Sequence, residues 1–314
     1  MIKYTLKRSL QSLGTLFIVI TVVFLLMRLM PEEGYFGSGF EKLDEVQKEA
    51  ILKNMGLRDP LVIQLKNFYI KLAKFDFGTS TTYRPNVSVN EIIKDKIPYS
   101  LWLGLSSVFI SMIVGIASGI MMARNKNGPL DKLGTLYIVI INAVPAAVYY
   151  LFLQLYLTKF LNLPILFDVD RPVSWILPII SMSLGSIAAY AMWMRRYMVD
   201  ELNKDYIKLA RAKGMKSKNI MTSHVMRNAL VPMVQYFPAS ILMAIGGSLY
   251  IESLYSIPGM GGLLVDSIQR QDNALVQALV LIFSTISIFG LLMGDILMAL
   301  VDPRIKFGNS GGGR

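Results

Sequence analysis

Residues 101–122 read LWLGLSSVFISMIVGIASGIMM, a stretch without a single charged side chain. A helix rises about 1.5 Å per residue, so this stretch can cross the roughly 30 Å hydrocarbon core of a bilayer. Working outward from it, five more stretches are comparably long and apolar: 9–30, 133–157, 175–194, 229–251 and 274–301. The sequence therefore predicts an all-α polytopic membrane protein with six transmembrane helices.

The composition of the whole chain agrees with this prediction. Of 314 residues, 54% are hydrophobic and 17% are charged, and the mean hydropathy is +0.49, which is too apolar for a soluble domain of this length. The absence of cysteine and the presence of one histidine argue against thiol catalysis and against zinc or iron sites. The sequence has no phosphate-binding Gly-rich loop with its lysine, and no grouped nucleophile and base. We therefore predict no catalytic residue, no metal site and no cofactor bound by this chain.

Basic residues are distributed unevenly between the predicted connections. Three lie before residue 9, three in 123–132, nine in 195–227 and three after residue 301, which makes eighteen on one side. The short connections on the other side contain only Lys159, Arg171 and Arg270. Because basic loops stay in the cytoplasm, we predict a multi-pass protein of the cell (plasma or inner) membrane with both termini cytoplasmic. The net charge of +11 is then a topology signal, and we predict contact with membrane lipid but no binding of nucleic acid.

The predicted order of segments follows from these spans and their orientation. It comprises a cytoplasmic N-terminus (1–8), the first transmembrane helix (9–30), an extracytoplasmic amphipathic helical segment (31–98), a transmembrane core (99–301) that includes a cytoplasmic loop (195–227), and a cytoplasmic tail (302–314).

The segment 31–98 is predicted to form short amphipathic helices. Gly56 is placed to end the first helix, Pro60 to begin the second, and the Ser88–Glu91 capping box to begin a third short one. These helices could be a lid that packs on the bundle or a docking surface for an external partner.

The loop 195–227, which we call the elbow, has the pattern of two helices joined by a turn. Leu202, Tyr206 and Leu209 repeat at helical spacing, and the small residues Ala210 and Ala212 precede Gly214, a natural helix terminator. Ser217 is predicted to cap a second helix that carries Ile220, Met221, His224 and Val225 on one side. The elbow could be a basic connector on anionic headgroups or a surface shaped to enter a partner's groove. We interpret His224 as a hydrogen-bonding residue of the elbow.

The sequence of the elbow resembles the coupling loop of ABC importer permeases, and specifically of the oligopeptide, dipeptide and nickel permease family. The resemblance rests on DYIKLARAKG at 205–214 and HVMRNALVP at 224–232. Lys208-Leu209-Ala210 stands where the general importer pattern has Glu-Ala-Ala. Further resemblances are Gly56-Leu57 with Pro60-Leu61, FGTS at 77–80, ESLYSIPGMG at 252–261 and VDPRI at 301–305. The long outer segment is similar to that of the B-type, oligopeptide permease-like subunit.

The resemblance implies a type I ABC importer-like fold with a cytoplasmic coupling helix-turn-helix. It implies a permease subunit of an ATP-driven importer that takes up peptides delivered by an extracytoplasmic peptide-binding protein. The implied partners are a second related permease subunit, forming a heterodimer, and two cytoplasmic ATPase subunits that bind ATP and Mg. The implied ATPase-coupling residues are Tyr206, Leu209, Ala210, Ala212, Lys213, Gly214, Ile220 and His224. The implied outer gate or binding-protein contact consists of Glu252, Ile257, Pro258, Gly259 and Gly261.

Two alternatives remain open at the level of sequence. One is a permease of the same kind for nickel or another small solute. The other is an ion-coupled secondary transporter, which would need ionisable residues or broken helices at mid-membrane. Asp295 is the clearest acidic residue inside a predicted span, and its place near the inner end favours a structural pairing or a headgroup contact.

Overall fold

The computed structural model describes residues 2–36, 43–234, 236–245 and 248–301, and every regular element within these ranges is a helix. The predicted tail from residue 302 and the pair Gly246-Gly247 lie outside the described residues. The elements are α1 (Ile2–Met27), η1 (Glu32–Tyr35), α2 (Glu45–Asn54), α3 (Leu61–Ala73), α4 (Val89–Arg124), α5 (Pro129–Ala143), α6 (Ala146–Phe152), η3 (Leu153–Leu157), α7 (Thr158–Leu161), η4 (Pro172–Trp175), α8 (Ile176–Leu202), α9 (Asp205–Ala212), α10 (Ser217–Asn219), η5 (Ile220–Met226), α11 (Arg227–Val234), α12 (Tyr236–Ile245), α13 (Leu249–Leu254), α14 (Met260–Gln269) and α15 (Asn273–Val301).

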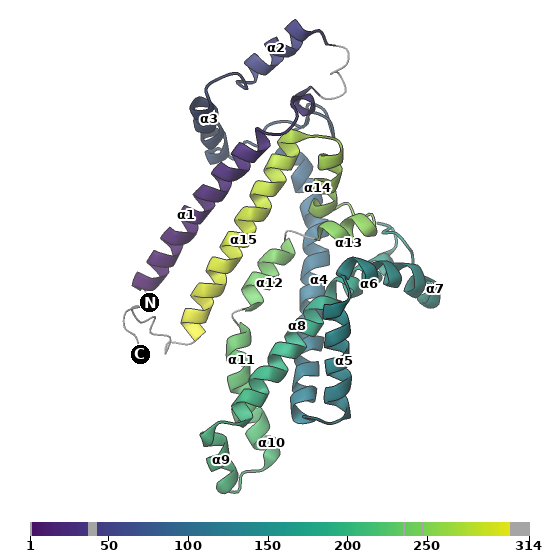
Figure 1. Ribbon diagram of the computed structural model, residues 1–314. Coiled ribbons are helices and arrows are strands. Elements are labelled where there is room, and N and C mark those ends of the chain that lie inside the picture. The colour runs from purple at the N-terminus through teal and green to yellow at the C-terminus, as the bar shows by residue number, and fades with distance from the viewer. Residues whose placement is uncertain (1, 37–42, 235, 246–247, 302–314) are drawn as a thin grey trace.

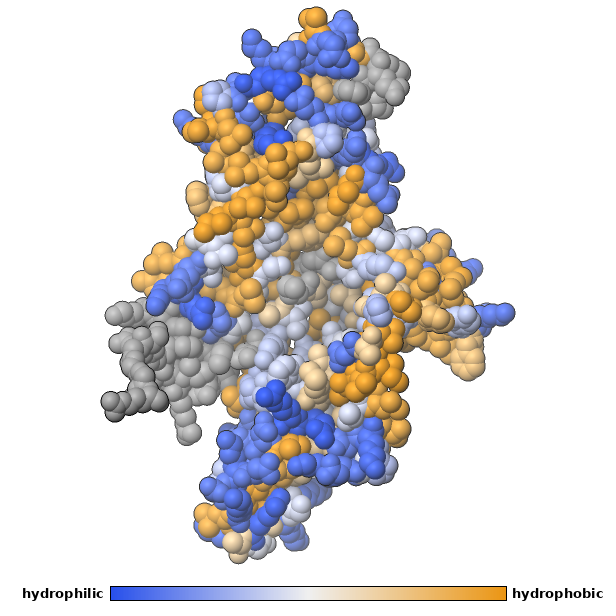
Figure 2. All heavy atoms as spheres, viewed as in Figure 1, coloured by the Kyte–Doolittle hydropathy of each residue, from blue (hydrophilic) through white to orange (hydrophobic). Residues whose placement is uncertain are grey.

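Four of these helices are long and apolar enough to cross a membrane. The candidate spans are Thr5–Met27 in α1, Val89–Arg124 in α4, Pro172–Leu202 in η4 and α8, and Asn273–Leu297 in α15. They match the first, second, fourth and sixth predicted stretches. In Figure 1, α1 lies beside α15, while α4, α8 and α5 form the neighbouring part of the bundle. Figure 2 shows hydrophilic surface at the α2 end and at the elbow end, with much of the hydrophobic surface between them.

The predicted count of six continuous spans is not confirmed. The third stretch consists of α5 followed by α6, η3 and α7, with a bend of 107° between the two arms, and it makes a fifth span only if the bent pair is counted as one. The bend lies at Val144 and Pro145, where Pro145 has no N–H to continue the helical hydrogen bonds. The fifth stretch is divided between α11 and α12, neither of which is long enough to span alone.

The end of the outer segment also differs from the prediction. The expected short third helix is not separate, because residues from Val89 onward form the first turns of α4. Ser88 precedes this helix without a side-chain cap hydrogen bond, and Pro98 lies inside it. The predicted boundary between 98 and 99 therefore falls within one continuous helix.

Small residues allow α4 to pack closely against α8. A Cβ added at Gly115 would lie 2.7 Å from the Cβ of Tyr190, and one added at Gly119 would lie 2.6 Å from the carbonyl oxygen of Ala191. Ser183 on α8 donates from its hydroxyl to the carbonyl oxygen of Ser107 on α4 at 3.2 Å. Small residues and hydroxyl hydrogen bonds are the usual means by which membrane helices associate, so this pair forms the centre of the bundle.

Candidate functional site

The elbow projects from the end of α8 and turns at Gly214 (Figure 1). Gly214 has φ +77°, in the left-handed region that favours glycine, as the sequence predicts. The Gly214 N–H donates to the carbonyl oxygen of Arg211 at 3.0 Å, and the Met215 N–H donates to that of Ala210 at 3.2 Å. This pair of bonds is a Schellman motif, which satisfies the free carbonyls at the end of α9. The second helix begins at Ser217 after Lys216, so Ser217 is not the cap that the sequence suggests.

Burial divides the predicted coupling residues into two groups. Ala210 and Ile220 are buried and pack, together with Ile207, in the core beneath the elbow. Leu209 is 56% exposed and Tyr206 is 40% exposed. Ala212, Lys213 and Gly214 are exposed as well. The outward surface of α9 thus carries two large apolar side chains beside small and basic residues.

Tyr206 links α9 to the segments on both sides of it. Its hydroxyl hydrogen-bonds to the carboxylate of Glu201 and accepts from the Asn228 side-chain amide at 2.7 Å. Burial, followed by the bond to Glu201, raises the pKa of Tyr206 above its ordinary value. The His224 ring lies 6.4 Å from the Tyr206 ring, edge to face. Tyr206 is therefore held in place although its ring is partly open to solvent.

The segment 248–262, which we call the Glu252 loop although it includes the short helix α13, contains a buried carboxylate, Glu252, one of the residues implied by the resemblance. Glu252 is 0% exposed, and its oxygens accept from the Ser100 hydroxyl at 2.8 Å and from the Gly261 and Gly262 N–H groups at 2.7 and 3.1 Å. Burial raises the pKa of Glu252, and these donors oppose that effect because they favour the ionised form. The carboxylate thus joins α13 to α4 and to the start of α14.

The other predicted outer residues pack around this carboxylate. Ile257, Gly259 and Gly261 are buried, and Pro258 is partly buried. A Cβ at Gly259 would lie 2.4 Å from a Glu252 carboxylate oxygen, and one at Gly261 would lie 2.8 Å from the Leu249 nitrogen. Within this chain the loop is therefore a packed structural unit whose glycines are required by close approach.

Two polar centres were missed by sequence reasoning. Asp272 is fully buried and accepts from the Ser80 hydroxyl at 2.5 Å and from the Thr82 and Tyr83 N–H groups at 3.0 Å, and so fastens the outer segment to the start of α15. An acidic residue directly before a long apolar run is an N-cap signal that could have identified it. The second centre is the ion pair between Asp131 and Arg195, 2.5 Å apart, which joins α5 to α8. No local sequence pattern indicates an ion pair between residues that are 64 positions apart.

The chain is similar in sequence to known membrane transport components. The model of the family described as binding-protein-dependent transport system inner membrane component matches residues 115–307. The chain is 34% identical to the dipeptide transport system permease protein of Lactococcus lactis, over 98% of this chain and 100% of that protein. It is 32% identical to the oligopeptide transport system permease protein of Haemophilus influenzae, with the same coverage.

A solved structure shares the fold. The crystal structure of an amino acid ABC transporter with histidines aligns with a TM-score of 0.53 at 16% identity, over 69% of this chain and 95% of that one. The family match covers more than half of the chain, and the full-length relatives exceed 30% identity. The chain therefore belongs to the family of binding-protein-dependent transport system inner membrane components.

Proposed function

We propose that this chain is a B-type permease subunit of an ATP-driven importer of peptides, which an extracytoplasmic peptide-binding protein delivers. It pairs with a second related permease subunit. Two cytoplasmic ATPase subunits bind ATP and Mg and supply the energy. Full-length similarity to dipeptide and oligopeptide permeases supports peptide as the solute. The eighteen-to-three distribution of basic residues supports six membrane crossings with both termini in the cytoplasm.

The exposed surface of α9 is the observation that carries the coupling part of this proposal. Leu209 and Tyr206 present apolar surface at the tip of a projecting structure, beside Ala212, whose small side chain permits close approach. Exposed apolar surface that is rimmed by polar residues is typical of a protein interaction site. The ATPase subunits bind this surface, while the buried residues Ala210 and Ile220 pack the elbow against the bundle.

The Glu252 loop has the role of an outer gate. Its carboxylate fastens α13 to α4 and α14 through neutral donors, so a movement of α4 relative to α14 must break or shift these hydrogen bonds. Such a unit moves as one body when the outer side of the pathway opens. Contact with the binding protein is restricted to the exposed positions of this loop, such as Ser253 and Ser256.

The two alternatives have less support. An ion-coupled secondary transporter would use an acidic residue in a span, but Asp295 lies 3.4 Å from Arg8 of α1, which is a structural pairing. Permeases for nickel and for other small solutes share this architecture, so the solute itself must be tested directly.

The function is tested by uptake of a radiolabelled dipeptide into proteoliposomes that contain this chain, its partner permease, the two ATPases and the binding protein. ATP-dependent uptake of dipeptide but not of nickel is expected. Uptake without ATP, driven by an ion gradient, would support the secondary transporter. Nickel uptake without peptide uptake would support an ABC permease whose solute is nickel.

The docking surface is tested by Ala212→Trp, which should reduce co-purification of the ATPases by overfilling their groove. The matched control is Lys208→Gln, which removes a neighbouring positive charge from the exposed side of the same helix. If only the charge-removing variant weakens the association, the elbow is a headgroup contact.

A further inference from the structure

A cavity of about 300 Å³ lies where the outer segment meets the helices α1 and α15. Its lining includes Arg28 directly after α1, Gln64 on α3 and Asn273 at the start of α15. A volume of this size is at the lower end of the range for small-molecule sites. The charged residues Lys71 and Asp76 also line it, so the cavity carries both signs of charge although its lining is mainly apolar.

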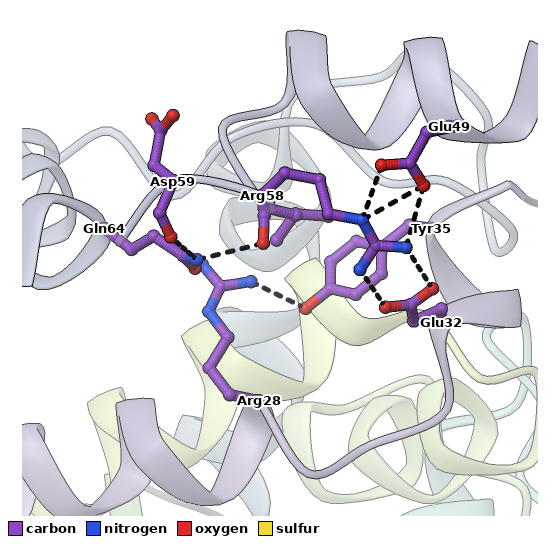
Figure 3. A network of polar contacts seen from close by, with 8 residues as sticks. Arg28, Glu32, Tyr35, Glu49, Arg58, Asp59 and Gln64 are labelled. Carbon is purple, nitrogen blue, oxygen red and sulfur yellow. Dashed lines mark hydrogen bonds and ion pairs between the residues drawn. The ribbon is translucent and has the colours of Figure 1, made fainter. Parts of the chain in front are cut away.

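The segments around this cavity are held together by polar contacts that need no ligand (Figure 3). Arg58 joins η1 to α2, because its guanidinium donates to Glu32 at 2.6 Å and to Glu49 at 3.0 Å. The Gln64 amide nitrogen donates to the carbonyl oxygens of Leu57 and Asp59, at 3.0 and 2.7 Å, and so holds the loop after α2 against α3. The cavity is therefore built into the fold.

The residues of this cavity account for all the unpartnered buried side-chain polar atoms in the described part of the chain. These atoms are Arg28 Nε, Gln64 Oε1 and Asn273 Oδ1. They comprise one cationic donor and two amide oxygens. Buried polar groups are nearly always hydrogen-bonded, and leaving one unpaired is costly. Three such groups around one cavity indicate that something outside this chain pairs with them.

The contacts that Arg28 and Asn273 make with neighbouring residues leave their side chains able to rotate toward a ligand. The Arg28 guanidinium donates through Nη1 to the Tyr35 hydroxyl at 3.2 Å and lies over the Phe24 ring at 5.0 Å, which leaves Nε unpaired. Asn273 is held by one long hydrogen bond to the Pro31 carbonyl oxygen, at 3.3 Å. The three unpaired atoms are covered by adjacent atoms, so side-chain rotation must accompany binding.

We propose that this cavity binds a small zwitterion, whose anionic oxygen accepts from Arg28 and whose primary ammonium group donates to the amide oxygens of Gln64 and Asn273. A cation that donates hydrogen bonds matches two acceptors, and an oxyanion matches the guanidinium. Two sources supply this chemistry. One is a free amino acid or peptide end, and the other is the headgroup of phosphatidylethanolamine, since Arg28 follows a helix long enough to span the bilayer.

Methylation of the ammonium group provides a sharp test, because a quaternary ammonium keeps its charge but has no N–H to donate. For the soluble source, the purified full chain in phosphatidylcholine nanodiscs is titrated calorimetrically with glycine and with glycine betaine. For the lipid source, the chain is extracted from vesicles that contain equal amounts of phosphatidylethanolamine and phosphatidylcholine, and the retained lipid is identified by native mass spectrometry. Transport is not measured, so the result is independent of the proposed function.

At least a tenfold preference for the primary ammonium is expected in one of the two arms, and the arm that shows it identifies the source. Arg28→Lys, which keeps the charge but loses the Nε donor, and Ala274→Phe, which fills the cavity, should each weaken binding at least tenfold. Lys66→Gln, exposed on α3 and away from the lining, should leave binding unchanged. Thermal unfolding of every variant shows whether it is folded.

The proposal is overturned if neither arm distinguishes the primary from the quaternary ammonium. Binding that survives Ala274→Phe in a folded variant also overturns it, because the ligand would then lie elsewhere. Absence of binding in both arms means that the cavity holds only water, whose molecules can donate to the amide oxygens and accept from Arg28.

Discussion

Gly214 shows how one backbone conformation can control a protein interface. No atom outside its neighbours lies within 4 Å of a Cβ added there, so the requirement for glycine comes from φ +77° and not from lack of space. A β-branched residue in this conformation costs about 1–3 kcal/mol, whereas asparagine enters the left-handed region more easily. Gly214→Val should therefore distort the elbow, and Gly214→Asn should largely preserve it.

The measurement compares peptide uptake and co-purification of the ATPases for the two variants. The amount of each variant inserted in the membrane is the control. Both should insert normally, because insertion depends on the apolar helices. The valine variant should lose association or coupling, and the asparagine variant should keep most of both. Equal behaviour of the two variants would show that the conformation at Gly214 has no part in coupling.

Glu252 shows what a buried carboxylate contributes to a membrane protein. In Glu252→Gln one carboxylate oxygen becomes an amide nitrogen, which faces backbone N–H donors that need an acceptor. Leaving a buried donor unpaired costs about 1–3 kcal/mol, so the variant should unfold at a lower temperature in detergent. The control is Asp266→Asn, an exposed acidic residue on α14. Equal unfolding temperatures for the two variants would contradict the structural role.

At the scale of elements, hydrophobic length predicted four helices well, but it did not indicate which prolines interrupt a helix. Pro145 lies at a 107° bend, whereas Pro98 lies inside a continuous helix of 36 residues. The same residue type had opposite outcomes because tertiary packing, and not the missing N–H alone, decides whether a helix continues. Gly115 and Gly119 of α4 serve packing, because a Cβ added at either position would meet α8.

The arm formed by α6, η3 and α7 buries two polar side chains and exposes several large apolar ones. Gln154 and Thr158 are buried, and the Gln154 amide donates to the Leu254 carbonyl oxygen at 2.8 Å. Phe160 is 82% exposed, and Phe152 stacks on the exposed Tyr156 ring at 5.5 Å. The arm is bent by 107° relative to α5, so it does not continue that helix across the bilayer. We therefore expect the arm to lie in the membrane interface.

This expectation is tested by depth-dependent fluorescence quenching on single-cysteine variants, since the chain has no native cysteine. A fluorophore at Phe160→Cys should be quenched by lipids brominated near the headgroup end of the acyl chain. A fluorophore at Asp170→Cys, in the exposed loop that follows the arm, should be quenched much less. Equal quenching at both positions would contradict an interfacial arm.

At the scale of the whole molecule, sequence patterns indicate which segments are basic or amphipathic, but they do not indicate the long-range contacts between helices. The basic elbow and the α2–α3 segment lie at opposite ends of the molecule (Figures 1 and 2). The Glu252 and Asp272 centres each join positions more than 150 residues apart. Such contacts depend on how the helices pack together, and local periodicity does not contain that information.

The arrangement of the whole molecule makes its orientation testable with two cysteines. Lys66 on α3 and Ser217 in the elbow are both exposed, and neither side chain belongs to a buried cluster. Because basic short loops remain in the cytoplasm, an impermeant thiol reagent applied to intact cells should label Lys66→Cys and not Ser217→Cys. Permeabilised cells should label both, which separates a shielded cysteine from an unreactive one. Labelling of Ser217→Cys alone in intact cells would invert the topology and place the elbow beyond the reach of cytoplasmic ATPases.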